Sequence, residues 1–361
     1  MAEAPQTSEI TLESIGGWPE LISSLLDRHD LDAAHARAAM TNILSGSATP
    51  AQLIGFVVAL RAKGETPEEL SGLLDAVLEA ATLVPLDDAT RERAIDIVGT
   101  GGDRSHSINV STMSAIVVAG AGVPVCKHGA RAASSQCGTA DVLEALGVAV
   151  ELSPEGVKQC VERAGMGFCL AARYHPAFRF AAPSRREIGV PTVFNLLGPM
   201  ANPGRVKRQL IGVANPLVAE RMLASLRLHG SKSSWVVHGG GHDELTTTGP
   251  STVLELRGGQ VRTFSVDPVS LGLAPAISEE LVGGTPAFNA DVVRRVMAGE
   301  QGAHRNIVVL NAGAGLVVAD VASSLEEGVA MAAESIDSGR ANETLTKLIT
   351  ESQAALAEFG A

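Results

Sequence analysis

The sequence predicts a small all-helical domain and a larger α/β domain with a mainly parallel central sheet. The first observation is length, because 361 residues correspond to about two domains at ~150 residues each. The second is that apolar residues recur at helical spacing from about residue 18 to residue 83. The third is that short β-type runs alternate with helical segments from about residue 93. Such alternation requires right-handed crossovers and favours parallel strands.

The N-terminal segment is expected to form four short helices. Thr49-Pro50 and Thr66-Pro67 each place a capping side chain before a proline at the first helical position, and Glu69 fits a capping box with Thr66. The apolar stripe of these helices either packs inside the domain or forms a subunit interface. The positions that carry the helical period are Leu53, Phe56, Val57, Leu60, Leu70, Leu73, Leu74 and Val77.

The α/β domain is expected to begin at about residue 93. Strands are predicted at 94–98, 123–127, 148–151, 209–213 and 235–238, and helices near residue 111, at 138–146 and at 217–228. Two β-type runs at 253–256 and 261–264 flank Gly258-Gly259, which is a hairpin signal, and the remainder is mostly helical. Residues 175–203 look like short helices that rejoin the first domain. The predicted domains are 1–92 with about 175–203, and 93–174 with 204–361.

Composition and charge narrow the class of protein. The formal net charge of −12 argues against nucleic acid as a partner. The four cysteines form no CxxC pair, so we expect small buried thiols in a reducing cytosol. No signal peptide is visible at the N-terminus, and the most apolar run, Ala115–Cys126, is too short to span a bilayer. We therefore expect a soluble, cytoplasmic protein with no membrane partner.

A glycine-rich turn follows the first predicted strand. In Gly99–Asp103, glycines free backbone N–H groups to face an anion, and the helix that follows adds its positive end. The turn lacks the Gly-Lys-Ser/Thr of a Walker A loop and is not GxGxxG, so a nicotinamide dehydrogenase is not supported. Asn109, Ser111 and Thr112 stand where the next helix begins. One of them could be a helix cap, but three together favour a phosphorylated ligand or Mg²⁺.

Two further segments carry charged groups after strands. Lys127 to Arg131, followed by Ser134-Ser135, stands where ligands bind in open α/β sheets, and its two cations suit a diphosphate. His128 is either structural or part of the site. Asp243-Glu244 follows the strand predicted at 235–238, and both carboxylates of such a loop can reach Mg²⁺ or simply face solvent. No Ser-His-Asp or Cys-His arrangement is evident.

Together these motifs resemble the anthranilate phosphoribosyltransferase family over nearly the whole chain. The resemblance implies a fold of the nucleoside phosphorylase/phosphoribosyltransferase type and a homodimer formed through the helical domain. It also implies transfer of the 5-phosphoribosyl group from 5-phosphoribosyl 1-diphosphate to the amine of anthranilate, in tryptophan biosynthesis. The matching segments are Gly99–Asp103, Asn109–Thr112, Lys127–Gly129, Ser134-Ser135, Gly138–Gly147, His175-Pro176, Arg185–Gly189, Phe194–Pro199 and Asp243-Glu244-Leu245.

The resemblance assigns roles to positions of this chain. Arg185 would pair with the carboxylate of the aromatic acid, and Gly99 would line that pocket. Mg²⁺ would be held by Ser111, Asp243 and Glu244. The residues expected to bind the phosphoribosyl diphosphate are Gly99, Gly102, Asp103, Ser107, Asn109, Ser111, Thr112, Lys127, His128, Gly129, Ala130, Arg131, Ser134, Ser135 and Thr139. Catalysis would consist of positioning and charge stabilisation, with no protein nucleophile.

Departures from the family pattern cluster on the acceptor side. Ala130 replaces the Asn of a KHGNR motif, which normally contacts the aromatic substrate, and Phe180 replaces a common His. Arg104 and His106 replace smaller residues. Either the pocket tolerates these changes and anthranilate remains the acceptor, or the chain is a paralogue for another aromatic acid. Two alternatives of other kinds are a pyrimidine-nucleoside phosphorylase and a non-catalytic dimeric scaffold, and the intact phosphate and metal motifs disfavour both.

Overall fold

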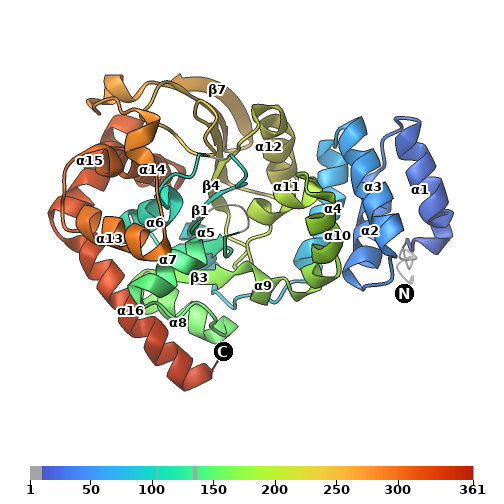
Figure 1. The fold of residues 1–361 in the computed structure, drawn as a ribbon, viewed down its shortest axis with the longest axis horizontal. Helices are drawn as coiled ribbons and strands as arrows, with labels where there is room; N and C mark the ends of the chain where they lie inside the picture. The colour runs from blue at the N-terminus through green and yellow to red at the C-terminus, as the bar shows by residue number, and fades with distance from the viewer. Residues whose placement is uncertain (1–9, 104, 133–135, 361) are drawn as a thin grey trace, which may run out of the picture. The chain divides into compact units, whose positions relative to one another are not determined.

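The structure, a computed structural model, describes residues 10–103, 105–132 and 136–360. The chain divides into two compact units, which are described separately (Figure 1). The first contains the chain up to Ala81 together with Ala177–Leu197, and the second contains Thr82–Pro176 and Gly198–Ala361. The predicted fold class, a small helical domain with a larger α/β domain, is confirmed.

The helical unit contains the four helices predicted at its N-terminal end. Thr49 and Thr66 each form a capping box, with Gln52 and Glu69 respectively, and a proline follows each threonine. The helices of this unit are α1 (Gly17–Leu26), α2 (Ala33–Leu44), α3 (Pro50–Lys63), α4 (Pro67–Glu79) and α10 (Ala182–Ile188), with 3₁₀ turns at Glu13–Ile15 and Pro176–Phe180. Helix α11 (Val193–Met200) begins in this unit and ends in the other.

The second unit is built on a seven-stranded sheet with strand order β3-β2-β1-β4-β5-β6-β7. The first five strands in this order are parallel, and the last two add an antiparallel hairpin. Gly258 and Gly259, both with positive φ, form the hairpin turn as predicted. The strands are β1 (Ile95–Gly99), β2 (Val125–Gly129), β3 (Met166–Leu170), β4 (Arg208–Gly212), β5 (Ser233–His238), β6 (Ser251–Arg257) and β7 (Gln260–Val266).

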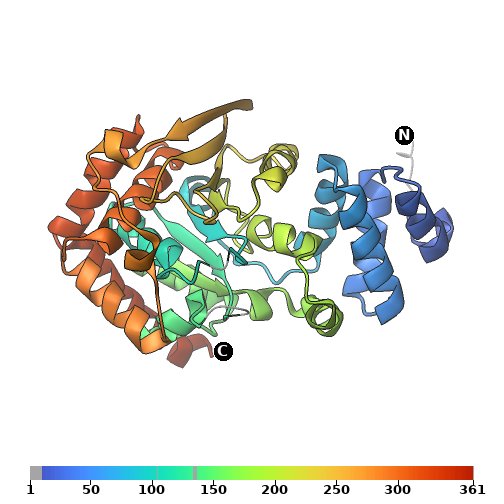
Figure 2. The ribbon, with the colours of Figure 1, turned by 45° about the horizontal axis from the view of Figure 1, so that its top comes forward.

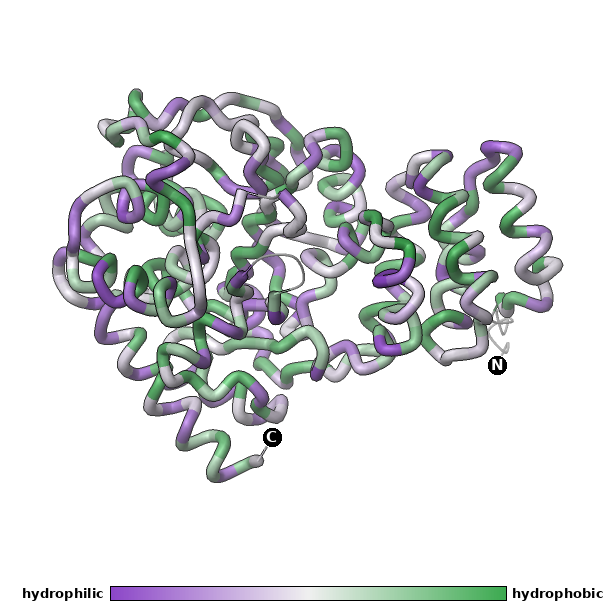
Figure 3. Tube along the Cα trace, in the orientation of Figure 1, coloured by the Kyte–Doolittle hydropathy of each residue, from purple (hydrophilic) through white to green (hydrophobic). Residues whose placement is uncertain are grey.

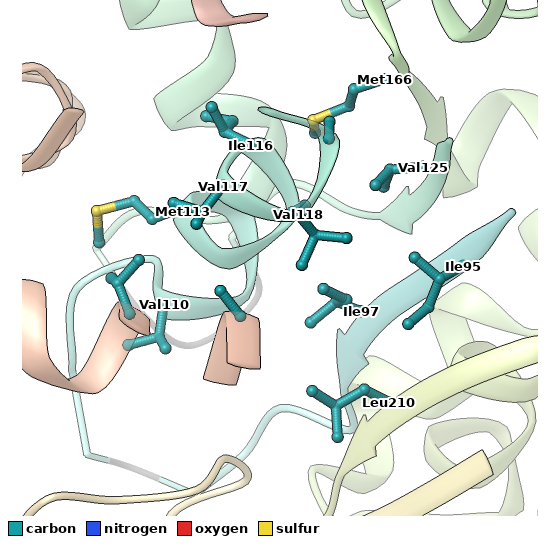
Figure 4. Close-up of a cluster of buried hydrophobic side chains, with 14 of the residues drawn as sticks. Ile95, Ile97, Val110, Met113, Ile116, Val117, Val118, Val125, Met166 and Leu210 are labelled. Atoms are coloured by element: carbon teal, nitrogen blue, oxygen red, sulfur yellow. The ribbon is translucent and has the colours of Figure 1, made fainter. Parts of the chain in front are cut away.

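Helix α6 (Val110–Gly120) is the buried centre of this unit. Its apolar side chains meet Ile97 of β1 and Leu210 of β4 in the core (Figure 4). Helices α14, α15 and α16 pack against it and lie together on one side of the unit (Figure 2). Along α16, hydrophilic and hydrophobic residues alternate, as expected of a helix with one buried face (Figure 3). The other helices are α5 (Asp88–Arg93), α7 (Thr139–Leu146), α8 (Pro154–Ala164), α9 (Ala171–Tyr174), α12 (Ala219–Leu228), α13 (Pro286–Met297), α14 (Ala303–Val318), α15 (Leu325–Asp337) and α16 (Arg340–Phe359).

The strand predicted at 148–151 is wrong. These residues lie in the connection between α7 and α8, and the third strand is β3, which the sequence analysis missed. Val148 and Val150 are buried by packing, and the Ala149 N–H donates to Ser352 Oγ of α16 at 3.0 Å. These apolar residues are therefore buried by packing against a helix and not by pairing with another strand. The pattern of a short apolar run does not distinguish these two kinds of burial.

The first unit ends at Ala81, before the boundary expected at residue 92. The connecting segment belongs to the second unit because the Val84 N–H donates to the Pro203 carbonyl at 3.1 Å and Arg208 Nε donates to the Glu92 carbonyl at 3.1 Å. All four cysteines are buried free thiols, as predicted. No helix in the described ranges has the length and apolarity that a bilayer span requires.

Candidate functional site

The candidate site lies where the strand order of the sheet reverses. The chain continues from β1 to β2 on one side, and β4 is added later on the other side of β1. At such a switch point the loops beyond the carboxyl ends of the strands diverge and leave room for a ligand. The first two predicted motifs begin within the last residues of β1 and β2, and the third follows β5, so the fold brings them to this edge.

Asp243 fills the space between the ends of β1 and β4. A Cβ on Gly99 would lie 2.1 Å from Asp243 Oδ2, and a Cβ on Gly212 would lie 1.4 Å from the Asp243 carbonyl oxygen. Both strands must therefore end in glycine for the acidic loop to lie here. The Gly101 N–H donates to Asp243 Oδ2 at 2.7 Å and joins the glycine-rich turn to this loop.

The glycine-rich turn opens toward free space. Gly101 and Gly102 have φ values of +67° and +79°, and among the described residues, apart from each glycine and its immediate chain neighbours, no heavy atom lies within 4 Å of a Cβ built on either residue. Glycine adopts this left-handed conformation without steric cost and lets a ligand approach the backbone closely. Gly101 and Gly102 thus form an accessible stretch of main chain beside Asp243.

Three carboxylates come together beside this turn. Burial and the charge of Asp103 raise the pKa of Asp243 to about 7. Burial, followed by the charges of Asp243 and Asp103, raises the pKa of Glu244 well above its usual value. Glu244 Oε2 is buried and has no hydrogen-bond partner among the described residues. A cation between these groups would reduce the repulsion between the carboxylates and would give the unpaired Glu244 oxygen a partner.

The carboxylates alone do not make a complete metal site. No group of three or more metal-ligating side chains arranged to hold an ion occurs in the described part of the chain. Mg²⁺ commonly uses one or two carboxylates and completes its coordination with water and substrate phosphates. The donor set of Asp243 and Glu244, with its orphaned oxygen, fits that mode of binding.

Lys127 is buried against the same groups. Its Nζ donates to the Ile97 carbonyl and, at 3.3 Å, to Ser111 Oγ. Burial lowers the pKa of Lys127 to about 8, although Asp96, Glu244 and Asp243 oppose the shift. The ammonium group is thus placed between the sheet, the acidic loop and the beginning of α6.

The first turn of α6 contributes the polar residues predicted from the sequence. The Ser111 backbone N–H interacts with Glu244 and favours its charged form. Thr112 is fully buried, and its hydroxyl has no partner among the residues that the structure describes. Ser107 lies before the helix and forms an antiparallel bridge with Val282. The positive end of the α6 dipole lies here, and together with the Lys127 ammonium group it favours an anion.

His128 is a buried, neutral imidazole. Its Nδ1 lies 3.0 Å from the Gly198 carbonyl, and its ring centroid lies 5.0 Å from that of His175. Burial, with a smaller effect of His175, lowers the pKa of His128 to about 3. Nε2 of His128 has no hydrogen-bond partner within the described ranges. This position is compatible with a structural role for His128 and with a role in the site.

Arg131 is held by acidic residues. Its guanidinium lies 2.9 Å from Glu144 Oε1, 3.1 Å from Glu151 Oε1 and 3.7 Å from Asp141 Oδ1. The pairs with Glu144 and Glu151 hold the pKa of Arg131 above its usual value. In this structure Arg131 therefore takes part in a surface ion-pair network.

The remaining residues of the second motif lie around the start of α7. Ala130 is exposed, and its carbonyl accepts a hydrogen bond from the Ala140 N–H at 3.2 Å. A Cβ on Gly129 would lie 3.1 Å from Thr139 Cβ, so glycine permits this close approach. Ser134 and Ser135 lie outside the described residues, as does Arg104.

Arg185 belongs to the helical unit, on α10. Its guanidinium lies 4.8 Å from the centroid of the Phe194 ring, and Phe194 meets Phe178 edge to face at 5.5 Å. Burial lowers the pKa of Arg185. Within the described ranges its guanidinium has no hydrogen bond or ion pair. A partly desolvated cation without a counter-ion is costly, so this position calls for an anionic ligand.

Phe180 lies on the same unit. Arg179 stacks over its ring, with Cζ 4.4 Å from the centroid, and the residue is 41% exposed. Gly46 approaches Phe180 closely, because a Cβ there would lie 2.7 Å from Phe180 Cε1. Phe180 is thus a partly exposed aromatic surface, whereas a His would offer polar ring nitrogens.

Asn311 supports the site but was missed in the sequence analysis. Its Oδ1 accepts from the Leu245 N–H at 3.0 Å, and its Nδ2 donates to the Leu245 carbonyl at 2.8 Å. It thereby holds the backbone directly after Glu244. The available signal was a single amide in the otherwise apolar run of α14, where it is 3% exposed.

Comparison with protein families matches both units. A model described as "Glycosyl transferase family, a/b domain" matches residues 91–342, and one described as "Glycosyl transferase family, helical bundle domain" matches residues 19–81. An anthranilate phosphoribosyltransferase of Salinispora arenicola is 50% identical over 338 residues, which cover 92% of this chain and 96% of that protein.

Solved structures give the same relation. Anthranilate phosphoribosyltransferase of Thermus thermophilus has a TM-score of 0.86 and 40% identity, covering 92% of this chain and 99% of that one. The Saccharomyces cerevisiae enzyme, in complex with PRPP and Mg, has a TM-score of 0.85 and 27% identity, covering 93% and 98%.

Proposed function

The chain belongs to the anthranilate phosphoribosyltransferase family, and we propose that it transfers the 5-phosphoribosyl group of phosphoribosyl diphosphate (PRPP) to the amine of anthranilate, as in tryptophan biosynthesis. The observation that carries the proposal is the convergence of Asp243, Glu244 and Lys127 beside an open glycine turn. Carboxylates for a divalent cation and donors for an anion, at one switch point, suit a metal–diphosphate group.

Mg²⁺ would be held by Asp243 and Glu244, with Ser111 beside them. The orphaned Glu244 Oε2 and the mutual repulsion of the carboxylates support this assignment. When bound, the cation neutralises negative charge on the departing diphosphate.

The protein's own groups complete the environment of the leaving group. The exposed main chain of Gly101 and Gly102, the first turn of α6 and the Lys127 ammonium all favour a polyanion. In the proposed reaction the bond between the anomeric carbon and diphosphate breaks, and its electron pair leaves with diphosphate. The amine nitrogen forms the new bond and afterwards loses a proton. No protein nucleophile is required, so the rate depends on positioning and charge stabilisation.

A second candidate is transfer to another aromatic acid. Ala130 cannot hydrogen-bond through its side chain, and Phe180 offers an apolar ring where the family commonly has His. Both changes make the acceptor side less polar while the donor motifs remain intact. A panel of aromatic acids therefore has to accompany anthranilate in any assay.

The proposed function is tested by measuring diphosphate release from PRPP with Mg²⁺ and each aromatic acid. Anthranilate is expected to support release, together with formation of the corresponding N-phosphoribosyl product. Phosphorolysis of thymidine or uridine is measured in parallel, and activity there alone would favour a nucleoside phosphorylase. If none of the aromatic acids supports diphosphate release, the proposal is contradicted.

We expect Ala130→Asn to sharpen the preference for anthranilate. A polar contact discriminates strongly between acceptors, whereas an apolar wall discriminates weakly. The kcat/KM ratio between anthranilate and substituted aminobenzoates should rise, while KM for PRPP stays constant. If the wild type uses anthranilate alone and the variant leaves this ratio unchanged, Ala130 is a neutral substitution.

The quaternary structure is also a proposal. The family resemblance implies a homodimer, and light scattering coupled to gel filtration should return twice the chain mass. A monomeric mass at assay concentration would contradict it. The cytoplasmic location stays a prediction.

A further inference from the structure

Two amide side chains, the buried Asn289 and the half-buried Asn109, connect α13 to the beginning of α6. We propose that Asn289 fixes the orientation of the Asn109 amide, so that Asn109 presents an N–H to an oxygen of the phosphoribosyl donor. Asn289 is then a positioning residue, which acts through Asn109. The inference rests on the proposed function, because it takes PRPP as the ligand.

The backbone brings these two residues together. The Gly283 N–H donates to the His106 carbonyl at 2.7 Å, and the Ile108 N–H donates to the Leu281 carbonyl at 3.0 Å. The segment before α13 is therefore paired with the segment that leads from the glycine turn into α6. Asn289, in the first turns of α13, is 2% exposed and lies within reach of Asn109.

The polarity of the contact follows from a backbone group. The Gly284 N–H can only donate, and it lies 2.8 Å from Asn289 Oδ1. Asn289 must therefore present Nδ2 to Asn109, and Nδ2 donates to Asn109 Oδ1 at 2.8 Å. This places the Asn109 amino group on the opposite side, where it donates to the Cys137 carbonyl at 3.3 Å.

Cys137 favours the same orientation. Its carbonyl can only accept, and its Sγ lies 3.5 Å from Asn109 Oδ1. Burial and the charge of Asp141 raise the pKa of this thiol to about 11, so it remains protonated and can donate to that oxygen. A flipped Asn109 amide would turn an oxygen toward the Cys137 carbonyl and an amino group toward Asn289 Nδ2. Both contacts would be repulsive.

One donor of Asn109 is left over. The amino group has two hydrogens, and only the hydrogen bond to Cys137 uses one within residues 10–103, 105–132 and 136–360. Asn109 stands at the N-cap position of α6 without a capping hydrogen bond from its side chain. Its remaining N–H thus lies at the positive end of the helix, where a phosphate or ribose oxygen of PRPP can accept it.

The test is Asn289→Asp, which keeps the shape of the side chain. An Asp carboxylate still accepts from the Gly284 N–H but cannot donate to Asn109 Oδ1. If the Asn109 amide flips, its amino group donates to this carboxylate, and its oxygen then faces the ligand. We expect the Kd of PRPP with Mg²⁺, measured by calorimetry, and KM for PRPP to rise about 10- to 100-fold, as for loss of a hydrogen bond to a charged group. KM for the acceptor should not change.

A double-mutant cycle separates this role from general support of the fold. In an Asn109→Ala background, Asn289→Asp should change the Kd of PRPP less than twofold, because the group it orients is absent. Asn42→Asp, on α2 of the helical unit, is the matched control and should leave the Kd of PRPP unchanged. Circular dichroism and the thermal midpoint check that each variant is folded. If Asn289→Asp does not fold, Asn289→Ala replaces it in the same cycle.

The outcomes distinguish the two proposals. Wild-type protein that fails to bind PRPP contradicts the proposed function and this inference together. Wild-type protein that binds PRPP, with an unchanged Kd in the folded Asn289 variant, contradicts only the orientation of Asn109 by Asn289. If the Asn289 substitution weakens PRPP binding equally in the wild-type and Asn109→Ala backgrounds, that result also contradicts only the orientation of Asn109 by Asn289.

Discussion

Replacing Asp243 and Glu244 together by Ala is expected to abolish Mg²⁺-dependent turnover. Burial raises the pKa values of both carboxyl groups, the charge of Asp103 adds to the shift of Asp243, and the charges of Asp243 and Asp103 add to that of Glu244. One Glu244 oxygen has no partner among the described residues. If they hold Mg²⁺ as proposed, the variant lacks both carboxylate ligands, and the charge on the departing diphosphate is no longer neutralised. A loss of several kcal/mol of transition-state stabilisation corresponds to a fall in kcat/KM of at least about a hundredfold.

The measurement is initial rate against Mg²⁺ concentration at saturating PRPP and acceptor. Glu326→Ala with Glu327→Ala is the matched control, since it removes two adjacent but exposed carboxylates and should leave the rate unchanged. The thermal midpoint of the Asp243/Glu244 variant should not fall greatly, because the substitution also removes like-charge repulsion. Undiminished activity at saturating Mg²⁺ would exclude these residues as ligands.

The features of the fold that the sequence predicted are those whose partners lie close together in the sequence. The segment Gly99–Asp103 begins at the last residue of β1, and in the helical unit Thr49 and Thr66 cap their helices through residues three positions away. The strand at 166–170 was missed because another apolar run, at 148–151, stood nearby and is buried by α16 instead. A short apolar run indicates that its residues are buried, but it does not indicate whether a strand or a helix covers them.

The residues that position the site could not be predicted in this way. Asn311 meets Leu245 from 66 positions away, and Asn289 meets Asn109 from 180 positions away. Arg131 illustrates the converse. Its place after a strand suggested a diphosphate ligand, but the direction of its side chain depends on Glu144 and Glu151, which the motif does not contain. Residue type and spacing indicate which chemistry is available, and the tertiary partners decide which groups remain free for a ligand.

Arg185→Ala is expected to weaken acceptor binding and to leave donor binding nearly unchanged. The Arg185 guanidinium is partly desolvated on the Phe194 ring, and in the described residues no carboxylate balances it. A carboxylate of the aromatic acid would supply two parallel hydrogen bonds as well as the missing charge. Breaking such a pair costs about 2–5 kcal/mol, so KM for the acceptor should rise about 30-fold or more.

Three variants make this prediction specific. Arg185→Lys keeps the positive charge but loses the planar fork, so it should recover only part of the acceptor affinity. Arg186→Ala removes the neighbouring exposed arginine and should behave as wild type. KM values for acceptor and for PRPP are measured for all three, with aniline as an acceptor that lacks the carboxylate. The discrimination between anthranilate and aniline should collapse in Arg185→Ala, because the charge that distinguishes them no longer has a partner. Equal increases in both KM values, with that discrimination retained, would show that Arg185 supports the fold of α10 and does not select the acceptor.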